Sequence, residues 1–240
     1  MIDLHSHLIP GIDDGAKDLD DALNLLRVAK EDGIKHITFT PHVHPGRFDN
    51  VKSSIQPEFE AFKASVADAG IEMSMAMAGE VRLSAEILAM VAQDQIPFLG
   101  EWEGKKVMLL ELPHSHVPPG SDKLVKWLID RNILPMIAHP ERNKDVVRDI
   151  AKIYPFIEMG CLLQVTSMSI AGRFGGPAEV RARELLQRGW VTVLATDAHN
   201  MDNRPPILSE GRAAAENLVG KAAADALVFD NPAKIVGISL

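Results

Sequence analysis

Residues 1–17 have the sequence MIDLHSHLIPGIDDGAK, and the fold prediction starts from this stretch. Its first residues are typical of a short β-strand, and two histidines at the end of that strand, His5 and His7, are separated by one residue. Alternate residues of a strand point to the same side, so both imidazoles can reach one metal ion. A Pro-Gly turn follows, and then come two aspartates, Asp13 and Asp14. The stretch therefore predicts a strand that carries metal-ligating side chains at its C-terminal end.

Six further β-rich runs follow, and each alternates with helical periodicity. The predicted strands cover residues 36–42, 72–80, 106–112, 133–139, 160–166 and 190–197. The first helix is predicted after Asp18, with an apolar stripe formed by Leu19, Ala22, Leu23, Leu26 and Ala29. Most of the later strands are apolar throughout, as strands covered on both faces should be. Seven βα units in one run predict an α/β protein with a parallel sheet or barrel.

Composition excludes several classes of protein. The chain has 240 residues and a formal net charge of -8, and it has no basic run that would track a nucleic acid. Its single cysteine, Cys161, cannot form an internal disulfide and is interpreted as a small buried residue. No signal peptide is recognisable, and no apolar run approaches the ~18 residues of a membrane span. These observations predict a cytoplasmic protein of one domain without membrane insertion.

Ionisable side chains gather at the ends of six of the seven predicted strands. They are His5, His7, His42, Glu80, Glu111, His139 and Asp197, with His199 two residues further on. The C-terminal ends of barrel strands share one rim, where active sites are built. Packing alone gives no reason to place ionisable groups there, because burying them unpaired is costly. Imidazoles mixed with carboxylates, and no thiolate, suit Mn²⁺, Fe or Zn²⁺.

Five segments together carry a resemblance to a known family. MIDLHSHLIPGIDDGAK, TPHVHPGRFDN, AGEVRL, AHPER and ATDAHN resemble the PHP (polymerase and histidinol phosphatase) superfamily, in particular its bacterial metal-dependent tyrosine-protein phosphatases of capsule and exopolysaccharide synthesis. The resemblance runs from Asp3 to the VFDNPAKIV segment near the end of the chain. It implies a distorted (β/α)7 TIM-like barrel, a single domain over residues 1–240, that binds three divalent metal ions, with manganese expected and iron or zinc as alternatives.

The resemblance also implies a distribution of ligands among the three ions. The first ion would be held by His5, His7, Glu80 and Asp197; the second by Glu80, Glu111 and His139; and the third by Asp14, His42 and His199. Asp13 is expected to support the turn instead.

Phosphate needs cations beyond the metals. Arg142, directly after His139 and Pro140-Glu141, is the best candidate because a guanidinium binds phosphate oxygens in a bidentate manner. Arg204 is the second candidate. His44, beyond His42 on the same rim, is a candidate either for supporting a metal ligand or for contact with substrate, and the general acid is left open among His44, His199 and Asp14.

Other residues are weaker candidates. Arg47 and Arg173 are predicted in loops at the same rim. His114 and His116 form a second H-x-H in a Pro-rich loop that faces substrate or solvent, and His36 at the opposite rim is interpreted as structural.

The function predicted from these residues is a metal-dependent phosphomonoesterase in which hydroxide activated by the metal ions attacks phosphorus. The resemblance points to a phosphotyrosine protein or peptide as substrate, namely the tail of a bacterial membrane tyrosine autokinase in exopolysaccharide or capsule regulation. Alternatives are a small-molecule phosphatase, such as one for histidinol phosphate, and a non-catalytic metal-binding regulatory barrel. A nuclease is disfavoured by the negative charge. The oligomeric state is left open.

Overall fold

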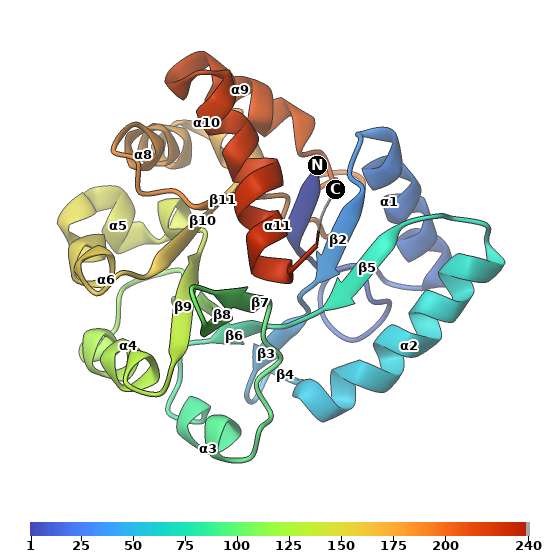
Figure 1. The fold of residues 1–240 in the computed structure, drawn as a ribbon, viewed down its shortest axis with the longest axis horizontal. Coiled ribbons are helices and arrows are strands. Elements are labelled where there is room, and N and C mark those ends of the chain that lie inside the picture. The colour runs from blue at the N-terminus through green and yellow to red at the C-terminus, as the bar shows by residue number, and fades with distance from the viewer. Residues whose placement is uncertain (239–240) are drawn as a thin grey trace.

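The structure is a computed structural model and describes residues 1–238. Figure 1 shows strands in the middle of the molecule with helices around them. The strands are β1 (Ile2–Ser6), β2 (His36–Phe39), β3 (His42–His44), β4 (Phe48–Asp49), β5 (Ser74–Met77), β6 (Glu80–Arg82), β7 (Gly100–Trp102), β8 (Lys105–Glu111), β9 (Ile133–Ala138), β10 (Leu162–Thr166) and β11 (Val193–Ala195). The α-helices are α1 (Leu19–Glu31), α2 (Lys52–Asp68), α3 (Ile87–Ala92), α4 (Ser121–Ile129), α5 (Lys144–Arg148), α6 (Tyr154–Glu158), α7 (Ser167–Ile170), α8 (Gly176–Gln187), α9 (Ser209–Val219), α10 (Lys221–Asp225) and α11 (Asn231–Val236). Short 3-10 turns cover Pro140–Arg142 (η1) and Ile150–Ile153 (η2), and a π-helical turn covers Ala226–Asp230 (η3).

The strands form two sheets, which are joined where two strands bend and pass from one sheet into the other. One sheet has the order β1-β2-β5 and the other the order β11-β10-β9-β8-β6-β3-β4, with β7 paired antiparallel to β8. The predicted strand over residues 36–42 is interrupted at Thr40–Pro41 and becomes β2 and β3, and the predicted strand over residues 72–80 is interrupted at Ala78–Gly79 and becomes β5 and β6. Counted as bent strands, these pairs complete the seven predicted parallel strands.

The chemistry of the two interruptions explains the bends. Pro41 has no amide hydrogen and cannot continue the ladder as a donor. Its carbonyl accepts from the amide of Glu80, whereas the amide of Gly79 donates to Pro97. A Cβ on Gly79 would lie 2.6 Å from Cγ of Pro97, so only glycine permits this approach. The barrel is therefore distorted where two neighbouring strands change partners together.

The first and last strands meet through a few contacts. Ser6 and Ala198 form an isolated parallel bridge, and the amide of Asp197 donates to the carbonyl of His5 at 2.8 Å. The buried carboxylate of Asp3 accepts from the amide of Thr196 at 3.0 Å and from its hydroxyl at 2.5 Å. Within residues 1–238 the strands do not form one continuous hydrogen-bonded cylinder. Side-chain bonds thus complete the junction at which both ends of the chain reach the rim.

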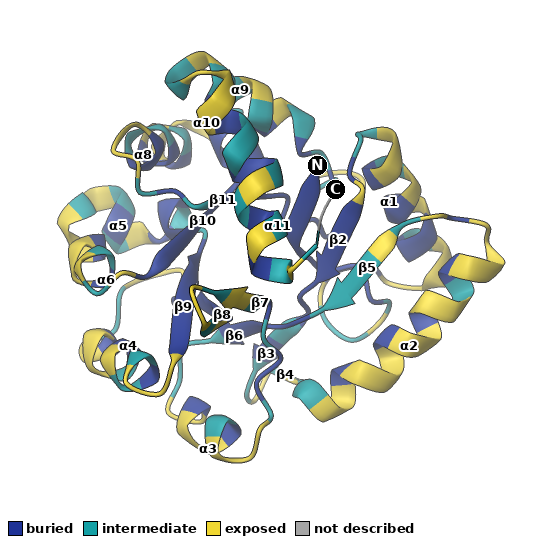
Figure 2. Cartoon of the chain, viewed as in Figure 1, coloured by how far each residue is buried: buried dark blue, intermediate teal, exposed yellow. Residues whose placement is uncertain are grey.

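The outer helices bury one face each. In Figure 2 most of the central strands are buried, β5 and β7 are partly exposed, and many of the exposed residues lie on the outer faces of the helices. Helix α1 begins after Asp18, whose side chain accepts from the amide of Asp21, as the predicted N-cap requires. One member of the predicted stripe is wrong, because Leu19 is 40% exposed and Leu25 is buried in its place. The buried residues of α1 are Ala22, Leu23, Leu25, Leu26 and Ala29.

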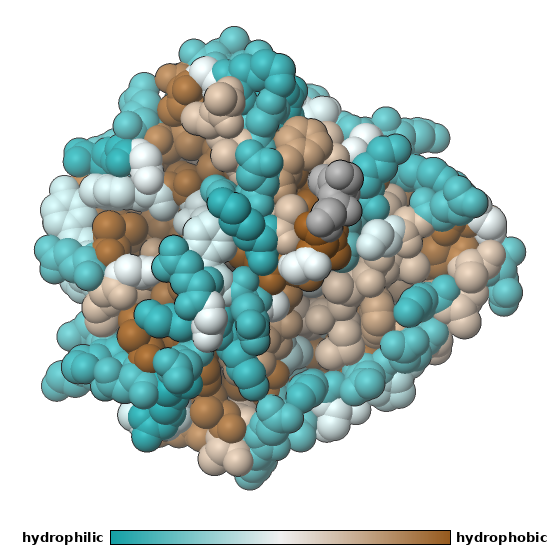
Figure 3. Space-filling model, viewed as in Figure 1, coloured by the Kyte–Doolittle hydropathy of each residue, from teal (hydrophilic) through white to brown (hydrophobic). Residues whose placement is uncertain are grey.

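Helix α11 covers the end of the strands opposite the rim. It packs against β7 and β1, and Figure 1 shows it in front of the strands near the N-terminus. Gly100 has φ +152, and a Cβ there would lie 1.9 Å from the carbonyl oxygen of Ile235, so glycine is required for this close packing. Figure 3 shows this face of the molecule, with hydrophilic helices at its edges and more hydrophobic surface between α11 and α2. None of the helices in residues 1–238 combines the length and the hydropathy needed to cross a bilayer.

His36 supplies a test of this packing. It is 3% exposed in β2, and its Nδ1 lies 2.9 Å from the hydroxyl of Ser74. Burial lowers the pKa of His36 to about 4. The unfolded chain therefore takes up a proton near pH 6.5 that the folded chain refuses, and stability is lost as the pH falls from about 6.5 toward 4.

We expect His36→Gln to remove this loss. Between pH 7 and pH 5 the free energy of unfolding of the unsubstituted chain should fall by about 1–2 kcal/mol more than that of the variant. Urea unfolding of the metal-free proteins at both pH values measures the difference. Parallel pH dependence in the two proteins would contradict the assignment.

Candidate metal centre

The first strand presents two fully buried imidazoles to the same point. Nε2 of His5 and Nε2 of His7 lie 3.1 Å apart. The amide of His139 donates to Oε1 of Gln164, which orients that carboxamide, so Nδ1 of His5 must donate to the same oxygen at 2.9 Å. Nδ1 of His7 lies 2.7 Å from Oδ2 of Asp13. Each ring thus uses Nδ1 for a supporting hydrogen bond and turns Nε2 toward the centre, which is the usual arrangement of a metal-ligating histidine.

Asp13 supports the turn, as predicted, and it also contacts two of the candidate ligands. Oδ1 of Asp13 accepts from the amide of Gly15 at 3.0 Å, which supports the turn. Its Oδ2 contacts His7 and also accepts from the amide of His42 at 3.0 Å. Burial raises the pKa of Asp13, but the charge and hydrogen bond of His7 outweigh burial and lower this pKa to about 2. Asp13 therefore orients His7 as a charged partner.

Asp14 points into the site from the same loop. Its Oδ1 lies 3.2 Å from Nε2 of His42 and 3.6 Å from Nε2 of His199. The hydrogen bond from His42 is the main reason that the pKa of Asp14 is held well below its usual range. This loop can approach β1 only because residue 15 is glycine: a Cβ there would lie 1.9 Å from the carbonyl oxygen of His7.

Glu80 is the central carboxylate of the cluster. It is 1% exposed at the start of β6. Oε1 lies 2.7 Å from Nε2 of His139 and 3.5 Å from Nε2 of His5. Oε2 lies 2.9 Å from Nδ1 of His42 and 3.5 Å from Nε2 of His7. Its two oxygens face different pairs of histidines, as a carboxylate that bridges two ions should.

Asp197, just after β11, has a similarly divided carboxylate. Oδ1 lies 3.3 Å from Nε2 of His5 and 3.4 Å from Nε2 of His7, whereas Oδ2 accepts from both Arg142 and Arg204. Burial raises the pKa of Asp197, but Arg204, His5 and Arg142 outweigh it and hold this pKa well below its usual range. The carboxylate therefore stays ionised although it is 1% exposed.

The histidines differ in charge when no metal competes with protons. Burial lowers the pKa of His5, but Glu80 and Asp197 outweigh burial and raise it to about 9. Burial also opposes the charged form of His42, and there Glu80 and Asp14 raise the pKa to about 11. Burial and then the charge of His7 lower the pKa of His199 to about 2. Metal binding must therefore displace protons from some of these rings.

Two of the predicted ligands have an unusual backbone. His139 has φ 31 and Asp197 has φ 53, in the left-handed region that residues with a Cβ seldom adopt. His139 directly follows the last residue of β9, and Asp197 lies two residues after the end of β11. The conformation costs roughly 1–2 kcal/mol for each residue. Such strain persists where surrounding contacts over-determine it, which is a common property of functional sites.

The structure brings all nine predicted ligands together. Their ligand atoms form four sets with mutual distances within 4.8 Å: His7, Asp14, His42 and His199; His5, His7 and Glu80; His5, His139 and Asp197; and His42, Glu80 and Glu111. These sets overlap more than the predicted distribution of ligands among three ions. His7, predicted for the first ion, also lies with the residues predicted for the third ion, and His42, predicted for the third ion, also lies with Glu80 and Glu111. The assignment of ligands to individual ions stays a prediction.

The donor atoms fit divalent cations. Five of the predicted ligands each have a buried oxygen or nitrogen that makes no hydrogen bond of good geometry among residues 1–238: His42 Nδ1, Glu80 Oε2, Glu111 Oε2, Asp197 Oδ1 and His199 Nε2. The first two of these atoms lie 2.9 Å apart, but they are not aligned as donor and acceptor. Burying a polar atom without a hydrogen bond costs free energy, and a bound cation would offset this cost by coordinating these oxygens and nitrogens. Imidazole and carboxylate donors without thiolate match the chemistry of Mn²⁺, Fe and Zn²⁺.

A cavity of about 230 Å³ opens beside the cluster. The predicted phosphate-binding residues Arg142 and Arg204 both line it, as do His44, Arg47 and His114. Arg47 lies 3.3 Å from Asp14. Arg173 pairs with Glu210 instead, and neither Arg173 nor His116 lines the cavity.

The sequence prediction missed two residues. Arg82 lines the cavity, and its Nη1 lies 2.8 Å from Oε1 of Glu111. It stands two residues after Glu80 on β6, so the same alternation that linked His5 and His7 could have indicated it. Gln164 is fully buried in β10 and orients His5. The sequence feature that could have indicated Gln164 is a carboxamide side chain between the apolar residues Leu163 and Val165 of a predicted strand.

The fold and site define a distorted α/β barrel with a cluster of histidines and carboxylates, the residue types of a metal site, at one rim. The chain belongs to the CpsB/CapC family, because the family model described as "Capsular polysaccharide synthesis, CpsB/CapC" matches residues 1–237. It is 31% identical to tyrosine-protein phosphatase YwqE of Bacillus subtilis over 85% of this chain and 79% of that protein. It is 27% identical to tyrosine-protein phosphatase CpsB of Streptococcus pneumoniae over 98% of each chain.

Solved structures agree with this assignment. One solved structure comes from work described as crystal structures of YwqE from Bacillus subtilis and CpsB from Streptococcus pneumoniae, "unique metal-dependent tyrosine phosphatases". It superposes on this chain with a TM-score of 0.91 at 28% sequence identity, and the match covers 99% of this chain and 94% of that one. A mutant organophosphorus hydrolase shares the fold alone, with a TM-score of 0.56 at 14% identity over 97% of this chain and 91% of that one. The resemblance stated from the sequence and the expected distorted barrel are both confirmed.

Gly15→Ala is expected to lower the bound metal content while the chain stays folded. The new methyl group must displace the loop that carries Asp13 and Asp14, because it would overlap the carbonyl oxygen of His7. Elemental analysis of purified protein, with circular dichroism as a check of folding, measures the effect. Gly176→Ala is the control, since a Cβ there meets no atom within 4 Å and no strained φ is involved. Equal metal content in the two variants would refute the role of Gly15.

Proposed function

We propose that this chain is a metal-dependent protein-tyrosine phosphatase, a hydrolase of phosphoric monoesters. The observation that carries the proposal is the arrangement around Asp197, where a cluster of candidate metal ligands and two arginines meet at the wall of one cavity. Such a site offers cations to the oxygens of a phosphoryl group. Relatives named as tyrosine-protein phosphatases support the choice of substrate.

We propose three divalent ions, with manganese first and iron or zinc as alternatives. His5, His7, Glu80 and Asp197 would hold the first, Glu80, Glu111 and His139 the second, and Asp14, His42 and His199 the third. When bound, the ions supply a water of lowered pKa and positive charge near phosphorus.

The two arginines position the phosphate. Arg142 and Arg204 already converge on Oδ2 of Asp197. The guanidinium of Arg142 is also held over the ring of Phe174, 5.0 Å from its centroid. A phosphate oxygen in the cavity would take up donors of both side chains, and bidentate geometry is the strength of arginine in this role.

His44 is proposed to contact the substrate as a neutral group. It lines the cavity, where burial and then the charge of Arg82 lower its pKa. A neutral imidazole can hydrogen-bond to the ester oxygen of phosphotyrosine. The departing phenolate has a pKa of about 10 and needs only modest help from an acid.

The physiological substrate is proposed to be the phosphotyrosine-rich tail of a membrane tyrosine autokinase in exopolysaccharide or capsule regulation. The family description, which refers to capsular polysaccharide synthesis, supports this choice. A cytoplasmic location belongs to the same proposal, because phosphotyrosine is made by kinases that use cytoplasmic ATP.

Metal-stripped protein should not hydrolyse a phosphotyrosine peptide, and adding back Mn²⁺, Fe²⁺ or Zn²⁺ should restore hydrolysis. Released phosphate is measured with each ion, and histidinol phosphate is the competing substrate. Failure of every ion would sink the proposal. A large preference for histidinol phosphate would instead support the small-molecule alternative.

His5→Ala and Asp197→Ala should each abolish turnover, with a loss of about 10²-fold or more, because each removes a candidate metal ligand. His5 belongs to two of the four sets, and Asp197 belongs to one set and also accepts from Arg142 and Arg204. Circular dichroism should show that the barrel stays folded. Full activity in both variants would refute the proposed ligands.

Cys161→Ser should leave turnover within about twofold of the unsubstituted enzyme. Cys161 precedes β10, is 7% exposed, and has its pKa raised by burial to about 12, so it holds no thiolate at neutral pH. An inactive Cys161→Ser variant that is folded would revive a cysteine mechanism.

A further inference from the structure

A second hollow adjoins the catalytic cavity. It has a volume of about 460 Å³, and its walls come from the His114 loop, from η1 and α5, and from the segment that leads into α8. His114 and Arg142 line both this hollow and the catalytic cavity. We call it the flanking groove, and its other lining residues are Glu141, Lys144, Val147, Arg148, Phe174, Pro177 and Ala178.

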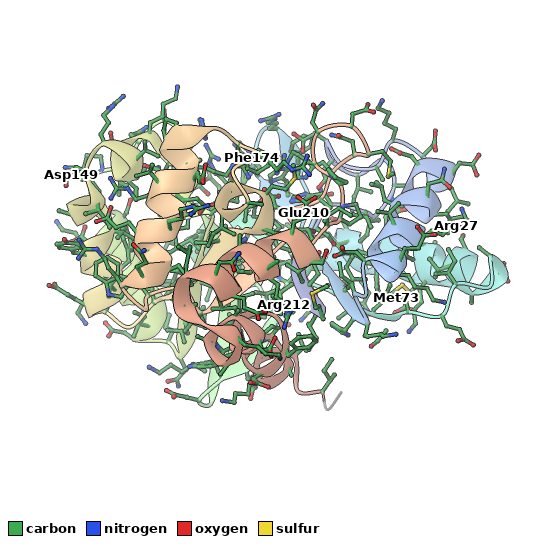
Figure 4. The ribbon with its side chains drawn as sticks, turned by 90° about the horizontal axis from the view of Figure 1, so that it is seen from above. Arg27, Met73, Asp149, Phe174, Glu210 and Arg212 are labelled. Atoms are coloured by element: carbon green, nitrogen blue, oxygen red, sulfur yellow. The ribbon has the colours of Figure 1, made fainter. Side chains whose placement is uncertain are left out.

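The floor of the flanking groove is apolar. Val147, Phe174 and Pro177 contribute carbon surface to it. Figure 4 shows Phe174 on the segment before α8, and Arg212 of α9 toward the opposite side of the molecule. Val180, one helical turn beyond Pro177, is 66% exposed and extends the apolar surface along α8. Such a floor suits side chains and backbone of a peptide better than it suits a small polar metabolite.

The accessible charges of the groove are positive. Lys144 is exposed and forms no ion pair within residues 1–238, whereas Arg148 pairs with Asp145 at 3.2 Å and still has a side chain 71% exposed. The acidic lining residue, Glu141, is fully buried, and its Oε1 accepts from the amide of Thr166 and the hydroxyl of Ser169. The carboxylate of Glu141 is therefore not accessible to a peptide in the groove.

Two other carboxylates, on α5 and directly after it, accept hydrogen bonds from backbone amides. Asp145 also accepts from the amide of Val117, and Asp149 accepts from the amide of Ala151. Figure 4 labels Asp149 at the outer edge of the molecule, well apart from Phe174. The charge of Lys144 also reaches the groove wall, because after burial the charges of Arg142 and Lys144 lower the pKa of His114.

This positive groove lies on a chain whose formal net charge is -8. The overall charge repels an anionic peptide, and local cations are the means by which such a protein can still recruit one. The groove and the catalytic cavity share Arg142, so a peptide with its phosphotyrosine in the cavity has neighbouring residues within reach of the groove.

We propose that the flanking groove binds the residues next to the phosphotyrosine and selects peptides with acidic side chains there. Lys144 and Arg148 pair with the acidic side chains, and Phe174, Val147 and Pro177 pack against the peptide. This inference rests on the proposed function, because it takes the catalytic cavity as the site of the phosphotyrosine.

The test compares three phosphotyrosine peptides that differ only in flanking residues, which are glutamate, glutamine or lysine. In the metal-loaded enzyme, kcat/KM should be about tenfold higher for the glutamate peptide than for the glutamine peptide, since an exposed ion pair changes binding several-fold. Lys144→Glu with Arg148→Glu should abolish or invert this ratio. The matched control is Arg27→Glu with Lys63→Glu, which changes the net charge equally at exposed positions of α1 and α2.

The outcomes separate the two proposals. An unchanged glutamate-to-glutamine ratio in the groove variant, or an equal change in the control, overturns the flanking groove. Binding of a glutamate-flanked phosphonotyrosine peptide, followed by fluorescence polarisation, gives a reading that needs no turnover, and the groove variant should bind it at least several-fold more weakly. If no phosphotyrosine peptide is hydrolysed, the proposed function fails, while the binding comparison still decides on the groove.

Discussion

The carboxylate of Asp197 is the interaction on which the site depends. One of its oxygens faces His5 and His7 on the first strand, and the other accepts from Arg142 and Arg204. The metal-ligating and phosphate-binding parts of the candidate site thus share a single group. Its position is set by the junction between β1 and the segment after β11, where Asp3 and Thr196 supply the supporting hydrogen bonds. A displacement at this junction would move both halves of the site together.

The concentration of buried charge explains other features of the barrel. Glu80 and Asp197 are nearly inaccessible, and each is surrounded by cationic or ionisable groups rather than by water. Removing so many charges from water costs free energy, and several candidate metal-ligating atoms still have no hydrogen-bond partner within the described residues. Tight support from outside the cluster, such as Asp13 on His7 and Gln164 on His5, keeps the rings in place. Rigid supporting contacts of this kind are what precise ligand geometry requires.

Much of the fold, and the gathering of the candidate ligands at one rim, could be predicted from the sequence because both depend on local rules. Alternation on a strand linked His5 with His7, and the common rim of parallel strands brought the other candidate ligands together. The bends at Pro41 and Gly79 could not be predicted, since they arise from contacts between strands. The contact of Arg82 with Glu111 likewise depends on the pairing of β6 with β8. Leu19 failed as a core residue because it is the first residue of α1 and lies about one turn before Ala22 and Leu23, where the buried face of the helix begins.

The junction between the first and last strands also bears on how the molecule is assembled. His5 and Asp197 meet across almost the whole length of the chain, and the hydrogen bond from Thr196 to Asp3 spans 193 residues. Contacts of such separation form late, because the entropy of closing a long loop must be overcome first. During synthesis the first two histidines leave the ribosome long before their last partners exist. The complete candidate site is therefore assembled only in a chain whose two ends have come together, so metal bound at the proposed site would report that folding has reached this step.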